Sequence, residues 1–166
     1  MVRRVLGLIV TGMWFVTAGC APKTQAPPVT TDFSCRIQAN YGDMAVTGEL
    51  TRHSAGTLEL TFSQPDTLDG LTALWDGETV TLQMYGLSFS VDPASVPESA
   101  LGEELIAVLD AALRGESQGR QENGNMVFEG QGKNGAYTLI CNGESGYPVS
   151  LTVPSLPLYA EFSEFE

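Results

Sequence analysis

Residues 33–51, FSCRIQANYGDMAVTGELT, decide the fold because they contain two runs that repeat with a period of two. Apolar or small residues occupy the odd positions before Gly42-Asp43 and the even positions after it. Such alternation gives a strand one apolar and one polar face, and a short turn between two such runs makes a hairpin. The stretch therefore predicts an antiparallel hairpin with one buried face.

The same alternation continues along most of the chain. Turn-forming Gly, Pro, Asn and Asp separate the runs, and Asp76-Gly77 is a strong hairpin signal. Residues 115–135 are rich in Gly, Gln and Asn, so their ends are predicted to be long surface turns around one short strand. Further strands are predicted over 58–62, 71–75, 80–84, 87–91, 126–129, 137–141, 147–153 and 158–165. About nine or ten strands in one curved antiparallel sheet with a single apolar face are expected.

One stretch, from Glu98 to Arg114, changes to a period of 3.6 and predicts a helix that ends before Gly115. Gly102 lies inside it, where glycine lowers helix propensity. The apolar face of this helix consists of Leu101, Leu105, Val108, Leu109 and Ala112. The expected fold is mainly β, an unclosed barrel formed by a curved antiparallel sheet, with one α-helix covering the open side.

The first 20 residues predict where the protein is located. Arg3 and Arg4 precede an uncharged, mostly apolar run (VLGLIVTGMWFV), and Thr17-Ala18-Gly19-Cys20 follows. The run is shorter than the ~20 residues of a membrane span, and this arrangement is typical of a secretory signal peptide. The cysteine after Ala-Gly resembles the bacterial lipobox, in which that cysteine is acylated, for example with palmitate, and becomes the first mature residue. The alternative is an ordinary signal peptide that ends near a cysteine.

This interpretation of the first 20 residues divides the chain into three segments. Residues 1–19 are predicted to be a lipoprotein signal peptide, and residues 20–30 the lipidated Cys20 with a flexible, Pro-rich tether. Residues 31–166 have the length of a single domain. We expect this domain to be extracytoplasmic, monomeric, and anchored to the cell membrane in the cell envelope through the lipid on Cys20.

The net charge narrows the choice of partners. Two of the eight basic residues lie in the predicted signal peptide, which leaves six against 20 acidic residues and a net charge of −14. A body this acidic repels nucleic-acid phosphates and anionic headgroups. Nucleic acid is therefore not an expected partner, and membrane attachment is assigned to the lipid.

Residue types that carry out catalysis are sparse. The single histidine, His53, falls in a predicted turn, and no Ser-centred elbow, phosphate-binding loop or metal-spaced cluster occurs. Four acidic residues surround the fourth predicted strand without the spacing of an EF-hand loop: Asp66, Asp69, Asp76 and Glu78. We interpret them as solvated turn residues, and we expect no enzyme, no cofactor and no metal site.

Two cysteines remain after Cys20. Outside the cytoplasm, Cys35 and Cys141 are candidates for a disulfide, provided that the first strand pairs with the strand that holds Cys141. The alternative is two buried free thiols.

Several stretches resemble the lipoprotein-localisation superfamily of LolA-like and LppX-like proteins. In that superfamily a strand ends in a Pro-containing loop, a hairpin follows, and a late turn with Gly and Pro leads to the final strands. Pro65, Asp76-Gly77 and Gly146-Tyr147-Pro148 occupy those places here. The stretches are TLELTFSQPDTLDG (57–70), LWDGETVTLQMYG (74–86), YTLICNGESGYPVSLTVP (137–154) and LYAEFSEF (158–165).

The resemblance implies a half-barrel whose concave apolar face holds a lipid or the acyl chain of a lipoprotein. The residues that fit this face are Leu58, Leu60, Phe62, Val80, Leu82, Met84, Phe89, Leu101, Leu105 and Leu109. If they pack against one another instead, they form a closed core. The chain would then be a non-enzymatic interaction or accessory module of an envelope complex, with other envelope proteins as partners.

The lipid anchor is directly testable. In the variant Cys20→Ala the acyl chains have no attachment point, so the protein should move from the membrane fraction to the soluble fraction. Intact-mass measurement of the wild-type chain should find the added mass of the lipid on Cys20. A Cys20→Ala protein that stays with the membrane, together with a wild type that lacks lipid mass, would contradict the prediction.

Overall fold

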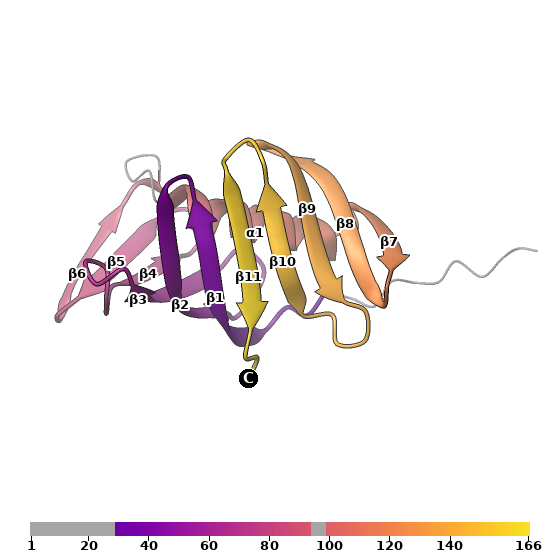
Figure 1. The fold of residues 1–166 in the computed structure, drawn as a ribbon. Coiled ribbons are helices and arrows are strands. Elements are labelled where there is room, and N and C mark those ends of the chain that lie inside the picture. The colour runs from indigo at the N-terminus through magenta and orange to yellow at the C-terminus, as the bar shows by residue number, and fades with distance from the viewer. Residues whose placement is uncertain (1–28, 94–98) are drawn as a thin grey trace, which may run out of the picture.

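A computed structural model of the chain describes residues 29–93 and 99–166. The predicted signal peptide, Cys20, most of the tether and Glu98 lie outside the described residues. In the described part, eleven strands form one antiparallel sheet in the order β6-β5-β4-β3-β2-β1-β11-β10-β9-β8-β7 (Figure 1). The strands are β1 Phe33–Tyr41, β2 Met44–Arg52, β3 Leu58–Gln64, β4 Thr72–Trp75, β5 Val80–Met84, β6 Leu87–Val91, β7 Gln118–Glu122, β8 Asn125–Gly132, β9 Gly135–Asn142, β10 Pro148–Val153 and β11 Leu158–Ser163.

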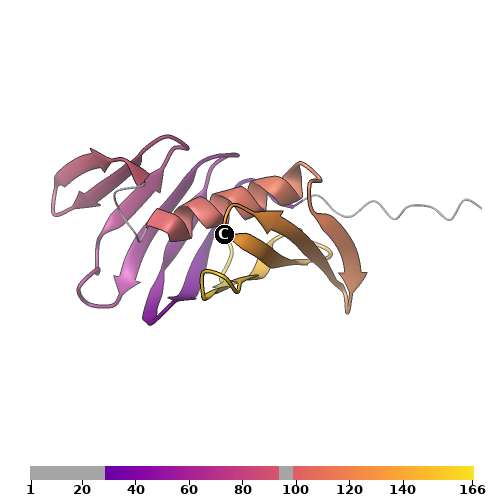
Figure 2. The same cartoon turned by 90° about the horizontal axis from the view of Figure 1, so that it is seen from above.

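The pairing of β1 with β11 sets the sheet order. It places the first and last strands side by side in the middle of the sheet, with Ala39 opposite Ala160. Each half of the chain then runs outward from this centre as a meander, so β6 and β7 form the two edges. The sheet is curved and does not close into a barrel (Figure 2).

The single helix of the described residues, α1 (Ser99–Leu113), lies across the concave face of this sheet (Figure 2). It follows β6 in the chain and precedes β7, so it joins one edge of the sheet to the other. The five residues of its predicted apolar face, Leu101, Leu105, Val108, Leu109 and Ala112, are all buried. The structure confirms a mainly β half-barrel with one covering helix. In the described part of the chain, no helix is long and apolar enough to cross a membrane.

The sequence prediction was only partly correct for residues 115–135: the short strand over 126–129 lies within β8, but β7 was not predicted. The ends of this stretch were expected to be surface turns, but β7 pairs with an elongated β8 around a turn in which Asn123 and Gly124 have φ values of 51° and 83°. All five residues of β7 are exposed and polar or glycine, so this strand has no apolar alternation to reveal it. Arg120 bridges to Glu129 of β8 (2.7 Å) and to Glu122 (3.2 Å).

A tryptophan packs directly against the helix backbone. Trp75 of β4 is buried, and a Cβ atom added to Gly102 would lie only 2.1 Å from its Cε2 atom. Glycine lowers helix propensity by about 1 kcal/mol relative to alanine. Gly102 is nevertheless required here, because no other residue leaves room for the indole ring.

Buried polar contacts hold the helix at two further points. Arg52 at the end of β2 is fully buried and forms an ion pair with Asp110, whose other oxygen lies 3.8 Å from Arg114. The side-chain amide of Asn134 donates a 2.7 Å hydrogen bond to the buried carboxylate of Glu104. Removing one partner of a buried ion pair typically costs about 3–5 kcal/mol, so the first contact fixes α1 firmly over β2.

The substitution Gly102→Ala should destabilise the protein despite its favourable helix propensity. The added methyl overlaps the Trp75 ring, and overpacking of this kind typically costs about 1–3 kcal/mol. Denaturant unfolding of Gly102→Ala, Trp75→Leu and the double variant would measure the coupling between the two positions. In the Trp75→Leu background the alanine should be tolerated; an equal effect in both backgrounds would contradict the proposed contact.

Candidate functional site

An apolar cavity lies where α1 begins above β3–β5. It has a volume of about 260 Å³, and its walls come from these three strands, the loop 65–71, Met44 and the first turn of the helix. The residues that give it its apolar character are Phe62, Ala73, Trp75, Val80, Leu82 and Leu101. Trp75 therefore contacts the helix and also lines the cavity.

The apolar surface continues beyond the cavity on the β5–β6 hairpin. Leu82 pairs with Phe89 and Met84 with Leu87, so these side chains lie on the same face of the sheet. Phe89 is 52% exposed and Leu87 is 66% exposed. The hairpin extends past the start of the helix (Figure 2), and we call the surface formed by Met84, Leu87 and Phe89 the hairpin strip.

The structure divides the ten residues of the predicted apolar face into three groups. Phe62, Val80, Leu82 and Leu101 line the cavity. Met84 and Phe89 belong to the hairpin strip. The remaining four are at most 1% exposed and pack in the core away from the cavity: Leu58, Leu60, Leu105 and Leu109.

Other lining residues were not predicted. Ala73 and Trp75 face the cavity from β4, and Leu68 and Leu71 face it from the preceding loop. The sequence carried a signal for the first two, because they alternate with Thr72 and Leu74 in a predicted strand. Leu71 shared this signal, because it begins the same predicted strand over 71–75, whereas Leu68 lies in a loop, which lacks a fixed period.

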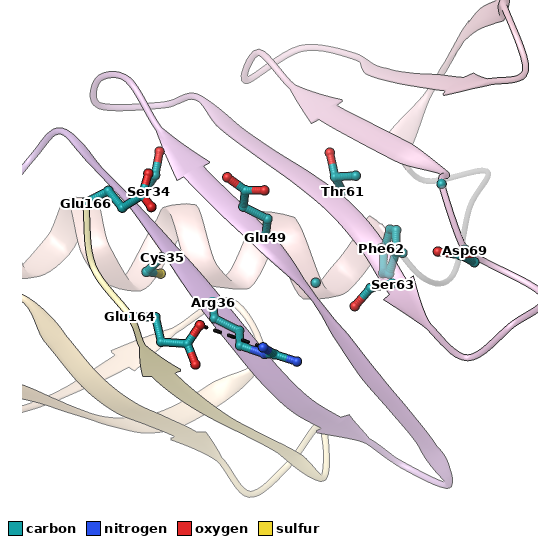
Figure 3. Close-up of a pocket in the computed structure, with 12 residues that line it drawn as sticks. Ser34, Cys35, Arg36, Glu49, Thr61, Phe62, Ser63, Asp69, Glu164 and Glu166 are labelled. Atoms are coloured by element: carbon teal, nitrogen blue, oxygen red, sulfur yellow. Dashed lines mark ion pairs between the residues drawn. The ribbon is translucent and has the colours of Figure 1, made fainter.

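A second hollow, of about 530 Å³, lies over β1–β3 and has a different chemical character (Figure 3). Arg36 and Glu49 lie opposite each other there, and Arg36 forms a 3.7 Å ion pair with Glu164. Asp69 and Glu166 add further carboxylates to its lining. This polar, mostly acidic hollow does not suit an apolar ligand.

Two other titratable residues considered in the sequence, Asp76 and His53, are exposed. The Asp76 carboxylate accepts hydrogen bonds from the backbone N–H groups of Thr79 (2.7 Å) and Glu78 (2.9 Å), which lowers the pKa of Asp76. This is the hydrogen bonding of a turn between β4 and β5. Within residues 29–93 and 99–166, no three His, Cys, Asp or Glu side chains are grouped so as to hold a metal ion.

The two cysteines of the domain are both buried and free. β1 pairs with β2 and β11, so β11 and β10 lie between Cys35 on β1 and Cys141 on β9. The strand pairing that a disulfide required therefore does not occur. The structure instead has the alternative, in which Cys35 and Cys141 are two buried free thiols. Burial raises the pKa of each thiol to about 12.

No protein-family model and no curated protein sequence matches the chain. Among solved structures, an uncharacterized conserved protein from Thermus thermophilus is similar with a TM-score of 0.51 at 12% identity, over 83% of this chain and 79% of that one. A LolA superfamily protein from Nitrosomonas europaea is similar with a TM-score of 0.40 at 10% identity, over 82% of this chain and 86% of that one. A structure of the CwlD amidase from Clostridioides difficile in complex with the GerS lipoprotein gives a TM-score of 0.47 at 14% identity, over 82% and 86%.

The likeness to the Thermus protein shows a shared fold. The unclosed antiparallel sheet with a covering helix is also the fold that the resemblance to LolA-like proteins implied. At these identities the similarity concerns the fold alone.

Thiol counting tests the state of the cysteines. In the native Cys20→Ala chain, neither Cys35 nor Cys141 should react with a thiol reagent at neutral pH, because both are buried and protonated. In denaturant both should react, and Cys35→Ala should leave only one reactive thiol. Finding no free thiol in denatured protein that was never reduced would contradict the pairing of β1 with β11.

Proposed function

We propose that this chain is a lipid-anchored, extracytoplasmic binding protein that holds an apolar chain in the cavity beside the start of α1. The ligand is a lipid or the acyl chain of a lipoprotein, and no catalytic step is involved. The observation that carries the proposal is the continuity of the apolar cavity with the exposed hairpin strip.

The size of the cavity limits the ligand. Pockets for small molecules typically have about 300–1,000 Å³, and this one has about 260 Å³. That space suits part of a single chain and not a lipid with several chains inside. The rest of the chain would lie along the hairpin strip, where Leu87 and Phe89 are exposed to solvent in the free protein.

The proposed site is smaller than the concave face as a whole. Under most of α1 the face is filled, since Leu60, Leu105 and Val108 are fully buried there. An apolar chain in that region would have to displace the helix, which the buried contact between Arg52 and Asp110 opposes. The ligand therefore enters where the cover ends.

The sequence supports an extracytoplasmic location. Cys20 follows a segment typical of a signal peptide, and the Pro-rich tether of residues 20–30 would hold the domain near the membrane surface. A ligand site in a membrane-tethered domain would have access to membrane lipids and to the acyl chains of neighbouring lipoproteins.

A second candidate function is the binding of another envelope protein. Its support is the edge strand β6, which has no partner on its outer side among the described strands and exposes Leu87 and Phe89. Exposed apolar surface at a sheet edge is typical of a protein contact site. In this case the cavity would be incidental and would bind no lipid.

Trp75 provides a probe that distinguishes the two candidates. Trp14 lies in the predicted signal peptide, so the mature chain would contain Trp75 as its only tryptophan. A single-chain lysophosphatidylcholine with a brominated acyl chain should quench Trp75 fluorescence if the chain enters the cavity. The titration should be done below the critical micelle concentration, with the unbrominated lipid as control.

Filling the cavity should abolish this quenching without unfolding the protein. Ala73→Phe places a ring in space that protein atoms do not occupy, so binding should be lost while the melting temperature changes little. Ala160→Phe is the matched control, because Ala160 is buried in the core and does not line the cavity. There, overpacking should cost about 1–3 kcal/mol. Absence of quenching in the wild type would reject lipid binding and favour the second candidate.

A further inference from the structure

The segment that supplies every lining residue of the cavity except Met44 contains no basic residue. Residues 54–113 include β3 to β6 and α1, and they hold no Lys, Arg or His. The same segment contains ten acidic residues: Glu59, Asp66, Asp69, Asp76, Glu78, Asp92, Glu98, Glu103, Glu104 and Asp110. The charge of this half of the protein is therefore strongly one-sided.

Two exposed carboxylates lie next in sequence to residues that line the cavity: Asp43 precedes Met44, and Asp66 lies between Pro65 and Thr67. Neither forms an ion pair with any described residue. Their negative charge is therefore not neutralised by the protein.

The basic residues that reach α1 from other segments already have acidic partners. Arg52 is fully buried against Asp110, which lies in the later half of the helix. Lys133 lies 3.8 Å from Glu103. Neither leaves a free cation at the cavity for the phosphate or carboxylate of an anionic ligand.

We infer that the cavity selects an apolar chain whose polar end carries no net negative charge, with a cationic end bound best and a zwitterionic or uncharged end accepted. This inference rests on the proposed function. The apolar walls take the chain, and the polar end remains near the flanking carboxylates. Charges on exposed groups act over a Debye length of about 8–10 Å at physiological ionic strength. Carboxylates next to the lining residues are therefore close enough to act on the polar end of the ligand.

A headgroup series tests the inference. Three brominated single-chain amphiphiles of equal chain length would be titrated into the mature chain: one with a trimethylammonium end, lysophosphatidylcholine, and lysophosphatidylglycerol. Quenching of Trp75 should give affinities that fall in this order, with roughly a tenfold difference between the cationic and anionic members at low salt. Added salt should reduce the difference.

A pair of charge-reversal variants locates the effect. Asp66→Lys should bring the affinities of the cationic and anionic amphiphiles close together. Glu144→Lys changes the net charge by the same amount in an exposed turn between β9 and β10, and it should leave the difference unchanged.

Equal affinity for all three amphiphiles, or tightest binding of the anionic one, would overturn the inference while leaving the binding function intact. An equal effect of the two variants would overturn it too, since selection would then follow net charge and not the cavity rim. If none of the amphiphiles quenches Trp75, the proposed function fails and the inference falls with it.

Discussion

The pairing of β1 with β11 is the constraint on which the rest of the structure depends. It joins the two halves of the domain at the centre of the sheet. As a result, β6 and β7, the strands that come immediately before and after α1 in the chain, form the outer edges. Across a flat sheet of this width the path between them would be about 48 Å, since strands are spaced about 4.8 Å apart. The 15 residues of α1 supply about 22 Å. Curvature of the sheet brings the edges closer together, and the helix that joins them then lies over the concave face and buries its apolar side.

The position of the cavity depends on where α1 begins and on where it packs tightly against the sheet. Gly102 lets the helix approach the ring of Trp75, and the ion pair of Arg52 with Asp110 fixes its later half over β2. α1 begins only at Ser99, yet the apolar face of the sheet continues through Leu82 to Phe89. The same side-chain alternation that fills the core under the helix therefore lines an open site past its end.

The sequence predicted the elements better than their arrangement. The alternation in residues 33–51 and the five apolar positions of the helix were correct because local period reports local structure. β7 was missed because QGRQE is exposed throughout and has no apolar period. The state of Cys35 and Cys141 depends on strand order, and the division of the predicted face into core and cavity depends on where α1 begins over the sheet. Both are properties of the tertiary structure, which period alone does not determine.

The two edges of the sheet differ in a way that bears on both candidate functions. β7 carries Arg120 and Glu122, and charged side chains on an edge strand oppose pairing with another strand. No charged residue occurs between Thr79 and Val91, so β5 and β6 together form an uncharged hairpin with exposed apolar side chains. Such an edge promotes association unless something covers it. An apolar chain along the hairpin strip would cover Leu87 and Phe89, and so would a strand of another protein. The two candidates therefore use the same surface, and an occupied cavity would change what a protein partner meets at this edge.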